Sequence, residues 1–281
     1  MIDNLYKEVE KLGPICVGLD TDLNYLPKKI KSRNNHISDM LFDFNKSVID
    51  STIDLVPTYK VQIAYYERYG IEGLIAYKRT LEYLKYSNSI SIADVKRGDI
   101  AASAQMYAKA HFEGDFEADM LTVSPYMGYE TLDPFLEYLD KGKSIFVLLR
   151  TSNDGAKDIQ YKESEDKYIY NHIGDKLQKI ASRYKGSSGY SNLGLVVGAK
   201  DKIDANEIRN RYNDLYFLIP GYGYQGGTGE DIRLYLNDLN GGVVNSSRGI
   251  LLNYKKHDDG EEKFEKYTRE AVLNMKKDIL G

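Results

Sequence analysis

A short charged segment, "DVKRGD" at residues 94–99, directly follows an apolar run with the composition of a buried strand. Because side chains alternate along a strand, Asp94 and Lys96 are expected on the same face. A lysine taken out of water tends to lose its proton, and a neighbouring carboxylate favours the charged form. Such a lysine can serve as a fixed cation or as a general acid. The alternative is a solvated turn in which Asp99 only caps the next helix.

Two further segments have residues suited to binding an anion. "PGYGYQGGTG" at 220–229 contains Gln225, and "NSSRG" at 245–249 contains Arg248. Glycines let the backbone approach an anion closely, and the planar guanidinium group can bind a phosphate through two hydrogen bonds. Each segment alone is more typical of an ordinary turn. Because both follow the last two expected strands, where barrels often bind phosphate, together they predict a phosphate site.

The elements that must position these residues follow a repeating pattern. Eight short apolar runs, typical of parallel strands buried on both faces, cover 14–20, 56–62, 89–96, 118–125, 143–149, 192–198, 214–221 and 241–247. Segments with helical spacing separate them, for example 36–54 and 70–87. The alternation predicts an α/β fold, a (β/α)₈ TIM barrel with a single domain over residues 1–281. An open doubly wound sheet is the alternative. The more polar region 151–191 is expected to be a loop followed by a helix.

Composition restricts the class of protein. The 281 residues include 38 basic and 42 acidic side chains, and the net charge of -4 argues against nucleic acid as the main partner. No stretch approaches the roughly 20 apolar residues of a membrane span, and no signal peptide is recognisable, so we expect a cytoplasmic protein. The single cysteine, Cys16, is expected in the core. The four histidines share no spacing, and we expect no metal site.

At this point the sequence resembles orotidine 5'-phosphate decarboxylases. "DVKRGDI" at 94–100 fits their D-x-K-x-x-D-I signature, and "TVSPYMG" and "LLRTSN" are similar to the longer bacterial (type 2) branch. The likeness runs from "VGLDTD" at 17–22 to "NSSRGI" at 245–250. It implies a (β/α)₈ barrel that works as a homodimer without metal or organic cofactor. The implied reaction converts orotidine monophosphate (OMP) to uridine monophosphate (UMP) and carbon dioxide, the last step of de novo pyrimidine synthesis.

The resemblance also implies catalytic roles for the charged segment. Lys96 corresponds to the general acid that protonates C6 of the pyrimidine. Asp94 would lie against the substrate carboxylate, and Lys60 and Asp94 would hold Lys96 in place. Asp99 corresponds to an aspartate that reaches the neighbouring subunit's site, with Ile100 beside it.

Substrate contacts are implied at five further positions. Asp20 would bind a ribose hydroxyl, Ser152 would contact the pyrimidine ring, and Gln225 and Arg248 would hold the phosphate. Ser103 stands where the family usually has a threonine with a role similar to that of Asp20, and serine keeps the hydroxyl.

Some charged and polar residues near these motifs are expected outside the site. Arg97 is expected at the surface or at a subunit contact, facing away from Lys96. Asn45 and Lys46, in the helix expected after the first strand, are expected at the surface.

Two rival functions remain open. One is a metal-dependent decarboxylase of a sugar-acid phosphate with the same D-x-K barrel. Its site requires an acidic metal ligand at the end of the second strand, where this chain has "YKVQ" with Lys60. The other is a non-catalytic nucleotide-binding barrel, which predicts loss of a charged residue from the set Lys60, Asp94, Lys96 and Asp99.

Overall fold

The fold is a closed barrel of parallel strands. The computed structural model describes residues 1–199, 204–223 and 227–281. The barrel strands are β1 (Ile15–Gly18), β2 (Thr58–Gln62), β3 (Ile90–Arg97), β4 (Met120–Val123), β5 (Ser144–Arg150), β8 (Leu193–Val197), β9 (Phe217–Pro220) and β10 (Gly242–Ser246). Their order around the barrel is β1-β10-β9-β8-β5-β4-β3-β2. Because β1 pairs with both β10 and β2, the sheet has no edge, and the open-sheet alternative is wrong.

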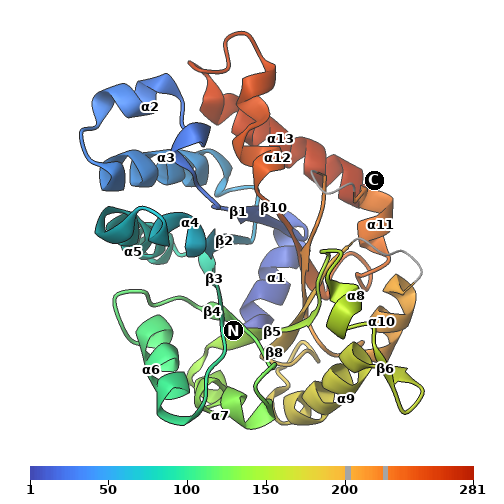
Figure 1. Cartoon of the computed structure of the whole chain (residues 1–281). Helices are drawn as coiled ribbons and strands as arrows, with labels where there is room; N and C mark the ends of the chain where they lie inside the picture. The colour runs from blue at the N-terminus through green and yellow to red at the C-terminus, as the bar shows by residue number, and fades with distance from the viewer. Residues whose placement is uncertain (200–203, 224–226) are drawn as a thin grey trace.

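Helices surround the strands (Figure 1). They are α1 (Ile2–Leu12), α2 (Lys28–Arg33), α3 (Ile37–Thr52), α4 (Ala64–Glu67), α5 (Gly70–Tyr86), α6 (Ala101–Phe112), α7 (Asp133–Leu136), α8 (Ala156–Ile159), α9 (Ile169–Ala181), α10 (Ala205–Arg211), α11 (Gly229–Arg233), α12 (Arg248–Leu251) and α13 (Phe264–Leu280). Shorter 3₁₀ turns are η1 (Leu23–Tyr25), η2 (Tyr129–Leu132), η3 (Leu139–Lys141), η4 (Ser182–Tyr184) and η5 (Asn253–Lys256). The predicted eight strands and the two predicted helices are confirmed. In the described part of the chain, no helix is long and apolar enough to cross a membrane.

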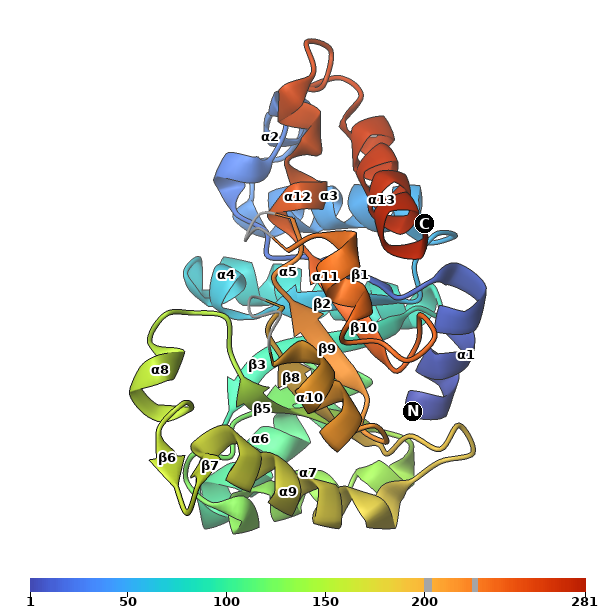
Figure 2. The same cartoon turned by 90° about the vertical axis from the view of Figure 1, so that its right-hand side faces the viewer.

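The barrel interior is apolar at its amino-terminal end. Cys16, Ile92, Phe146 and Leu218 belong to one buried cluster, and α1 contributes Ile2, Leu5 and Val9 to the same cluster. Figure 2 shows α1 on the side of the barrel away from α4 and α8, which follow the carboxyl ends of β2 and β5. Helix α1 therefore closes the bottom of the barrel, and the carboxyl end of the strands is where barrel enzymes have their active sites. The expected core position of Cys16 is confirmed.

Region 151–191 contains more structure than the sequence predicts. The predicted helix is present as α9, but the segment before it holds α8 and a small hairpin of β6 (Glu163–Ser164) and β7 (Lys167–Tyr168). The hairpin turn places Glu165 and Asp166 at positive φ, 50° and 59°. Such turns usually use glycine or asparagine, so this sequence lacks their signal.

The surface position expected for Asn45 is wrong, whereas Lys46 is partly exposed as expected. Asn45 is fully buried, accepts a hydrogen bond from Thr21 Oγ1 at 2.6 Å, and donates one to Tyr66 Oη at 2.8 Å. Tyr66 in turn donates to the carbonyl oxygen of Leu19 at 2.9 Å. This buried network fixes the chain at the end of β1, directly beside Asp20, because a buried polar group needs a partner.

Candidate active site

Asp94 lies at the centre of a charged array at the carboxyl end of the barrel. Its Oδ2 accepts hydrogen bonds from Lys60 Nζ and Gln62 Nε2, both at 2.9 Å. Its Oδ1 accepts from Lys96 Nζ at 2.6 Å and from Thr122 Oγ1 at 2.9 Å. Four donors thus occupy the roughly four lone-pair positions of one carboxylate. The arrangement fixes both the position and the charge of Asp94.

The array contains two cations and two carboxylates. Lys60 Nζ also lies 3.1 Å from Asp20 Oδ1, so its ammonium group bridges Asp20 and Asp94. Burial opposes the charge on Asp94, but Lys60 and Lys96 hold the pKa of this carboxyl well below its usual range. Burial likewise opposes the charge on Lys60, and the carboxylates of Asp20 and Asp94 overcome it and raise its pKa. Both groups are therefore ionised at neutral pH.

Lys96 differs from Lys60 in exposure and in backbone conformation. Its side chain is 46% exposed, whereas that of Lys60 is 5% exposed. Its φ is 42°, in the left-handed region, which costs a non-glycine residue about 1–2 kcal/mol. The pairing of β3 with β4 is irregular between Ala93 and Arg97, and the extra residues there turn the chain. The ammonium group is thereby directed into the open mouth of the barrel.

Thr122 on β4 holds this irregular backbone in place. Its hydroxyl oxygen accepts hydrogen bonds from the backbone nitrogens of Val95 at 3.0 Å and Lys96 at 2.9 Å, and the hydroxyl donates to Asp94. One side chain therefore connects the backbone of the lysine to the carboxylate that binds its ammonium group. Because strain of this kind persists only where the surroundings determine it, Thr122 is a structural requirement for the array.

Two cavities meet at this array. One, of about 290 Å³, is lined by Asp20, Lys60, Gln62, Tyr65, Asp94, Pro220, Gly221, Tyr222, Asn245, Ser246, Ser247, Arg248 and Gly249. The other, of about 300 Å³, is lined by Lys60, Asp94, Lys96, Thr122, Leu148, Thr151, Ser152, Asn153, Val196, Leu218 and Pro220. They share Lys60, Asp94 and Pro220, so the charged array separates two halves of one site. A ligand spanning both halves would place one end near Arg248 and the other near Ser152.

The strand alternation explains why the charges gather here. On β3, Ile92, Asp94 and Lys96 are spaced by two residues, with Ile92 in the apolar floor and the charged pair above it. Lys60 occupies the corresponding level of β2, paired in register with Ile92. At Gly18 on β1, an added Cβ would lie 2.9 Å from Asn245 Oδ1 on β10, so glycine leaves room for a side chain of the neighbouring strand.

Six of the predicted site residues lie around these two cavities: Asp20, Lys60, Asp94, Lys96, Ser152 and Arg248. Asp99, Ile100 and Ser103 do not line either cavity. Asp99 Oδ1 accepts a hydrogen bond from the backbone nitrogen of Ile100 at 2.8 Å, Ile100 is 58% exposed, and Ser103 is exposed in the first turn of α6. Helix α6 begins at Ala101, two residues after Asp99. Gln225 lies outside the described residues.

Sequence reasoning missed four residues of the site. Gln62 stands two residues after Lys60, so the strand period could have found it. Thr122 and Asn245 are polar residues inside otherwise apolar runs, and this pattern could have identified them as site residues. Tyr222 offered no signal beyond its neighbouring glycines.

Arg97 faces away from Lys96, as expected, but packs closely against α6. Its guanidinium carbon lies 4.9 Å from the centre of the Tyr107 ring, and its Nε donates to His111 Nε2 at 3.3 Å. Burial and the charge of Arg97 lower the pKa of His111 to about 4. His111 is thus a neutral, buried residue that packs against Arg97.

Barrels of the (β/α)₈ type have their catalytic groups at the carboxyl ends of the strands, where the lysine–carboxylate array and Arg248 lie, so the fold and the site define a barrel enzyme. Residues 13–263 match the family described as "Orotidine 5'-phosphate decarboxylase / HUMPS family". The chain belongs to this family.

Curated relatives span the whole chain. Proteins named orotidine 5'-phosphate decarboxylase are 57% identical in Petrotoga mobilis and 54% identical in Clostridium acetobutylicum, covering 99% of this chain and 98% of each relative. The solved structure of Leishmania donovani OMP decarboxylase has a TM-score of 0.74 at 29% identity, covering 96% of this chain and 98% of that chain. The predicted family, barrel fold and carboxy-lyase activity are confirmed.

Proposed function

We propose that this barrel converts OMP to UMP and carbon dioxide and that Lys96 protonates C6 of the pyrimidine. The observation that carries the proposal is the 2.6 Å ion pair between Lys96 Nζ and Asp94 Oδ1 at the junction of the two cavities. It holds a fixed cation beside a fixed anion at the point where a ligand spanning both cavities would react.

The chemistry requires such a cation. When the bond between C6 and the carboxylate breaks, its electron pair stays on C6 in an sp² orbital that the ring π system cannot delocalise. A preorganised positive charge stabilises that developing carbanion. Lys96 then donates a proton from Nζ to C6, which completes UMP, and its half-exposed ammonium group is restored by a proton from water.

Asp94 contributes in a second way. Because its pKa is held low by Lys60 and Lys96, it stays ionised beside the carboxylate of the substrate. Two carboxylates at close range repel each other, and the repulsion is relieved as carbon dioxide leaves. Lys60 keeps Asp94 charged and in place but carries no proton to the substrate.

The remaining site residues bind the parts of OMP that do not react. Arg248 binds the phosphate, together with Gln225 by resemblance. Asp20 binds a ribose hydroxyl in the cavity of about 290 Å³, and Ser152 contacts the pyrimidine in the neighbouring cavity. Binding energy from the distant phosphate then lowers the barrier for the reaction at C6.

The active unit is a homodimer in this proposal, and the partner supplies Asp99, with Ile100 beside it, to each site. Ser103 has a role similar to that of Asp20. The exposed side chains of Ile100, Met106, Tyr126 and Met127 provide apolar surface for the contact, at 58%, 55%, 78% and 51% exposure. The loop after β4 contacts the segment just before Asp99, because Ser124 N donates to the carbonyl oxygen of Arg97 at 2.7 Å. Exposed apolar groups gathered on adjacent segments are typical of protein interfaces.

The two rivals fit the geometry less well. The position of the rival's metal ligand is occupied by Lys60, whose ammonium group already bridges Asp20 and Asp94 and would repel a divalent cation. A non-catalytic barrel is disfavoured because all four charged residues are retained and Asp94 accepts four hydrogen bonds. We place the reaction, without metal or organic cofactor, in one catalytic domain over residues 1–281 in the cytoplasm, with no nucleic-acid or membrane partner.

The proposal is tested by incubating purified, chelator-treated protein with OMP and following ultraviolet absorbance. We expect conversion to UMP at an undiminished rate. Loss of all turnover in the chelator, restored by magnesium, would favour the sugar-phosphate rival. Binding of OMP without any turnover would favour the non-catalytic barrel.

A further inference from the structure

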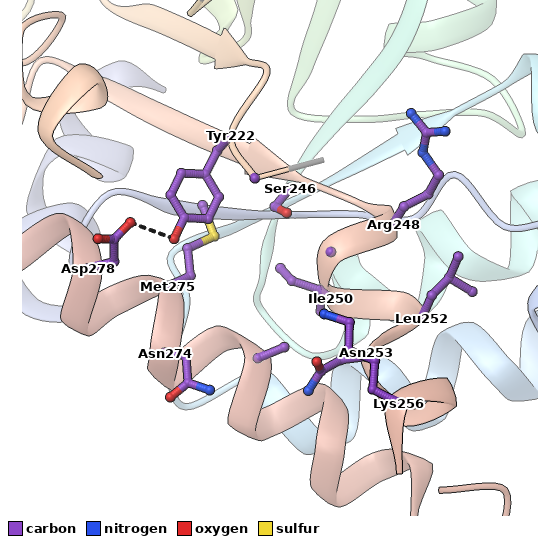
Figure 3. Close-up of a pocket in the computed structure, with 13 residues that line it drawn as sticks. Tyr222, Ser246, Arg248, Ile250, Leu252, Asn253, Lys256, Asn274, Met275 and Asp278 are labelled. Carbon is purple, nitrogen blue, oxygen red and sulfur yellow. Dashed lines mark hydrogen bonds between the residues drawn. The ribbon is translucent and has the colours of Figure 1, made fainter. Parts of the chain in front are cut away.

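A groove of about 670 Å³ lies next to the active site, between α12, η5 and α13. It shares Tyr222, Ser246, Arg248 and Gly249 with the cavity that would hold the phosphate. Figure 3 shows Tyr222 joined to Asp278 at one side of the groove and Arg248 at the other. Tyr222 therefore lines both the groove and the active-site cavity. Its hydroxyl is hydrogen-bonded to Asp278 on the last helix.

Asp278 makes two hydrogen bonds to the segment that follows β9. Its Oδ2 accepts from Tyr222 Oη at 2.9 Å and from the backbone nitrogen of Gly229 at 2.8 Å. One carboxylate oxygen thus binds two points that are seven residues apart in the sequence. The described parts of the segment also bind each other, since Gly223 N donates to Gly227 O at 2.9 Å and Gly227 N donates to Gly221 O at 3.3 Å.

The end of α13 forms a rigid support for this contact. Arg233 Nη1 donates to the carbonyl oxygens of Asp278 at 2.9 Å and Ile279 at 3.1 Å, which satisfies groups that a helix end leaves unpaired. The backbones approach so closely that a Cβ added to Gly229 would lie 2.2 Å from Asp278 O. Glycine at this position is therefore required for the approach.

We propose that Asp278 is a positioning residue that holds Tyr222 and Gly221 in the conformation that binds the phosphate of the substrate. The inference rests on the proposed function, because it assumes that the phosphate occupies the cavity lined by Gly221, Tyr222 and Arg248. A loop fixed in its binding conformation before the ligand arrives loses less entropy on binding. Burial and the neighbouring Asp278 carboxylate raise the pKa of the Tyr222 phenol, which therefore stays protonated and continues to donate.

The direction in which phosphate binding changes when Asp278 is removed distinguishes a positioning role from a purely electrostatic one. Asp278 is a negative charge near a site for a negative phosphate. If only its charge mattered, removing it would strengthen phosphate binding. If Asp278 positions Tyr222 and Gly221, removing it weakens phosphate binding.

The test compares D278A, D278N and Y222F with E270A, which removes a carboxylate from the same helix away from the groove. For D278A we expect KM for OMP to rise about tenfold, about 1.4 kcal/mol, with kcat within about twofold of the wild type. D278N keeps an oxygen acceptor and should recover most of the loss. Y222F loses one of the two bonds and should fall between them, whereas E270A should behave as the wild type.

Two parallel measurements complete the design. Turnover of orotidine, which lacks the phosphate, should be unchanged in D278A, and calorimetry should show weaker binding of UMP. An equal loss for OMP and orotidine, or tighter UMP binding in D278A, would overturn the positioning role. Absence of OMP turnover in the wild type would reject the proposed function alone, because UMP binding still reports on Asp278.

Discussion

Thr122→Val is the substitution that examines the site architecture most closely. Valine has nearly the shape of threonine but lacks the hydroxyl, so the change removes three hydrogen bonds at once. Asp94 Oδ1 loses a donor and keeps its bond to Lys96. The backbone nitrogens of Val95 and Lys96 lose their acceptor.

The size of the effect follows from these contacts. A buried donor left without an acceptor costs about 1–3 kcal/mol, so the loss of two acceptor bonds should lower the free energy of unfolding by about 2–6 kcal/mol. The left-handed backbone of Lys96, with φ at 42°, also loses its support. A displacement of about 1 Å in a catalytic group can cost about 100-fold in rate, so we expect kcat to fall by about that factor.

Urea unfolding and steady-state kinetics on OMP measure the two effects separately. Thr122→Ser keeps the hydroxyl and is the matched control, with an expected loss of stability of about 1 kcal/mol and nearly normal kcat. The reasoning would be refuted if T122V kept wild-type kcat and stability. It would equally be refuted if T122S lost as much kcat as T122V.

Three further expectations concern the phosphate, the dimer and pH. Arg248→Ala should raise KM strongly and lower kcat/KM by an amount equivalent to about 2–5 kcal/mol while the fold stays intact; unchanged kinetics on OMP would place the phosphate elsewhere. Lys96→Ala and Asp99→Ala should each be nearly inactive, and an equimolar mixture that exchanges subunits should recover about a quarter of wild-type activity, because half the dimers are mixed and each has one intact site. If mass spectrometry shows exchange without recovery, the shared site is wrong. The lowered pKa of Asp94 contributes stability above its unfolded value of about 3.9, and this is lost as the pH falls toward the folded pKa. Urea unfolding measured from about pH 5 to 3 should show that the free energy of unfolding of the wild type falls as the pH is lowered, and that the fall is smaller in D94N. An equal dependence of this free energy on pH in the two proteins would contradict the low pKa of Asp94.

The barrel strands could be predicted from the sequence because burial on both faces produces continuous apolar runs. β3 shows how far this reasoning extends to the site. Alternation correctly places Asp94 and Lys96 on one side, but the irregular pairing and the positive φ of Lys96 left no signal in the residue types. The hairpin of β6 and β7 was equally invisible, because its exposed two-residue strands have no apolar pattern.

Polar residues buried by partners far away in the sequence were the main source of error. Asn45 looks like a surface residue by type, and only Thr21, Tyr66 and Thr80 make its burial possible. Thr122 is similar, because its three bonds all lead to β3. The local composition of the sequence does not predict tertiary contacts of this kind.

The central claim is that Lys96 supplies the charge and the proton at C6, and kcat of Lys96→Ala on OMP tests it most directly. Its side chain is 46% exposed and Asp94 retains Lys60, so the variant should fold and still bind UMP. Loss of a general acid costs about 10²–10⁴ in rate, and loss of a preorganised charge about 10²–10³. We therefore expect kcat to fall by about 10⁴-fold or more, with UMP binding retained. A folded Lys96→Ala enzyme with kcat within about tenfold of the wild type would contradict the claim.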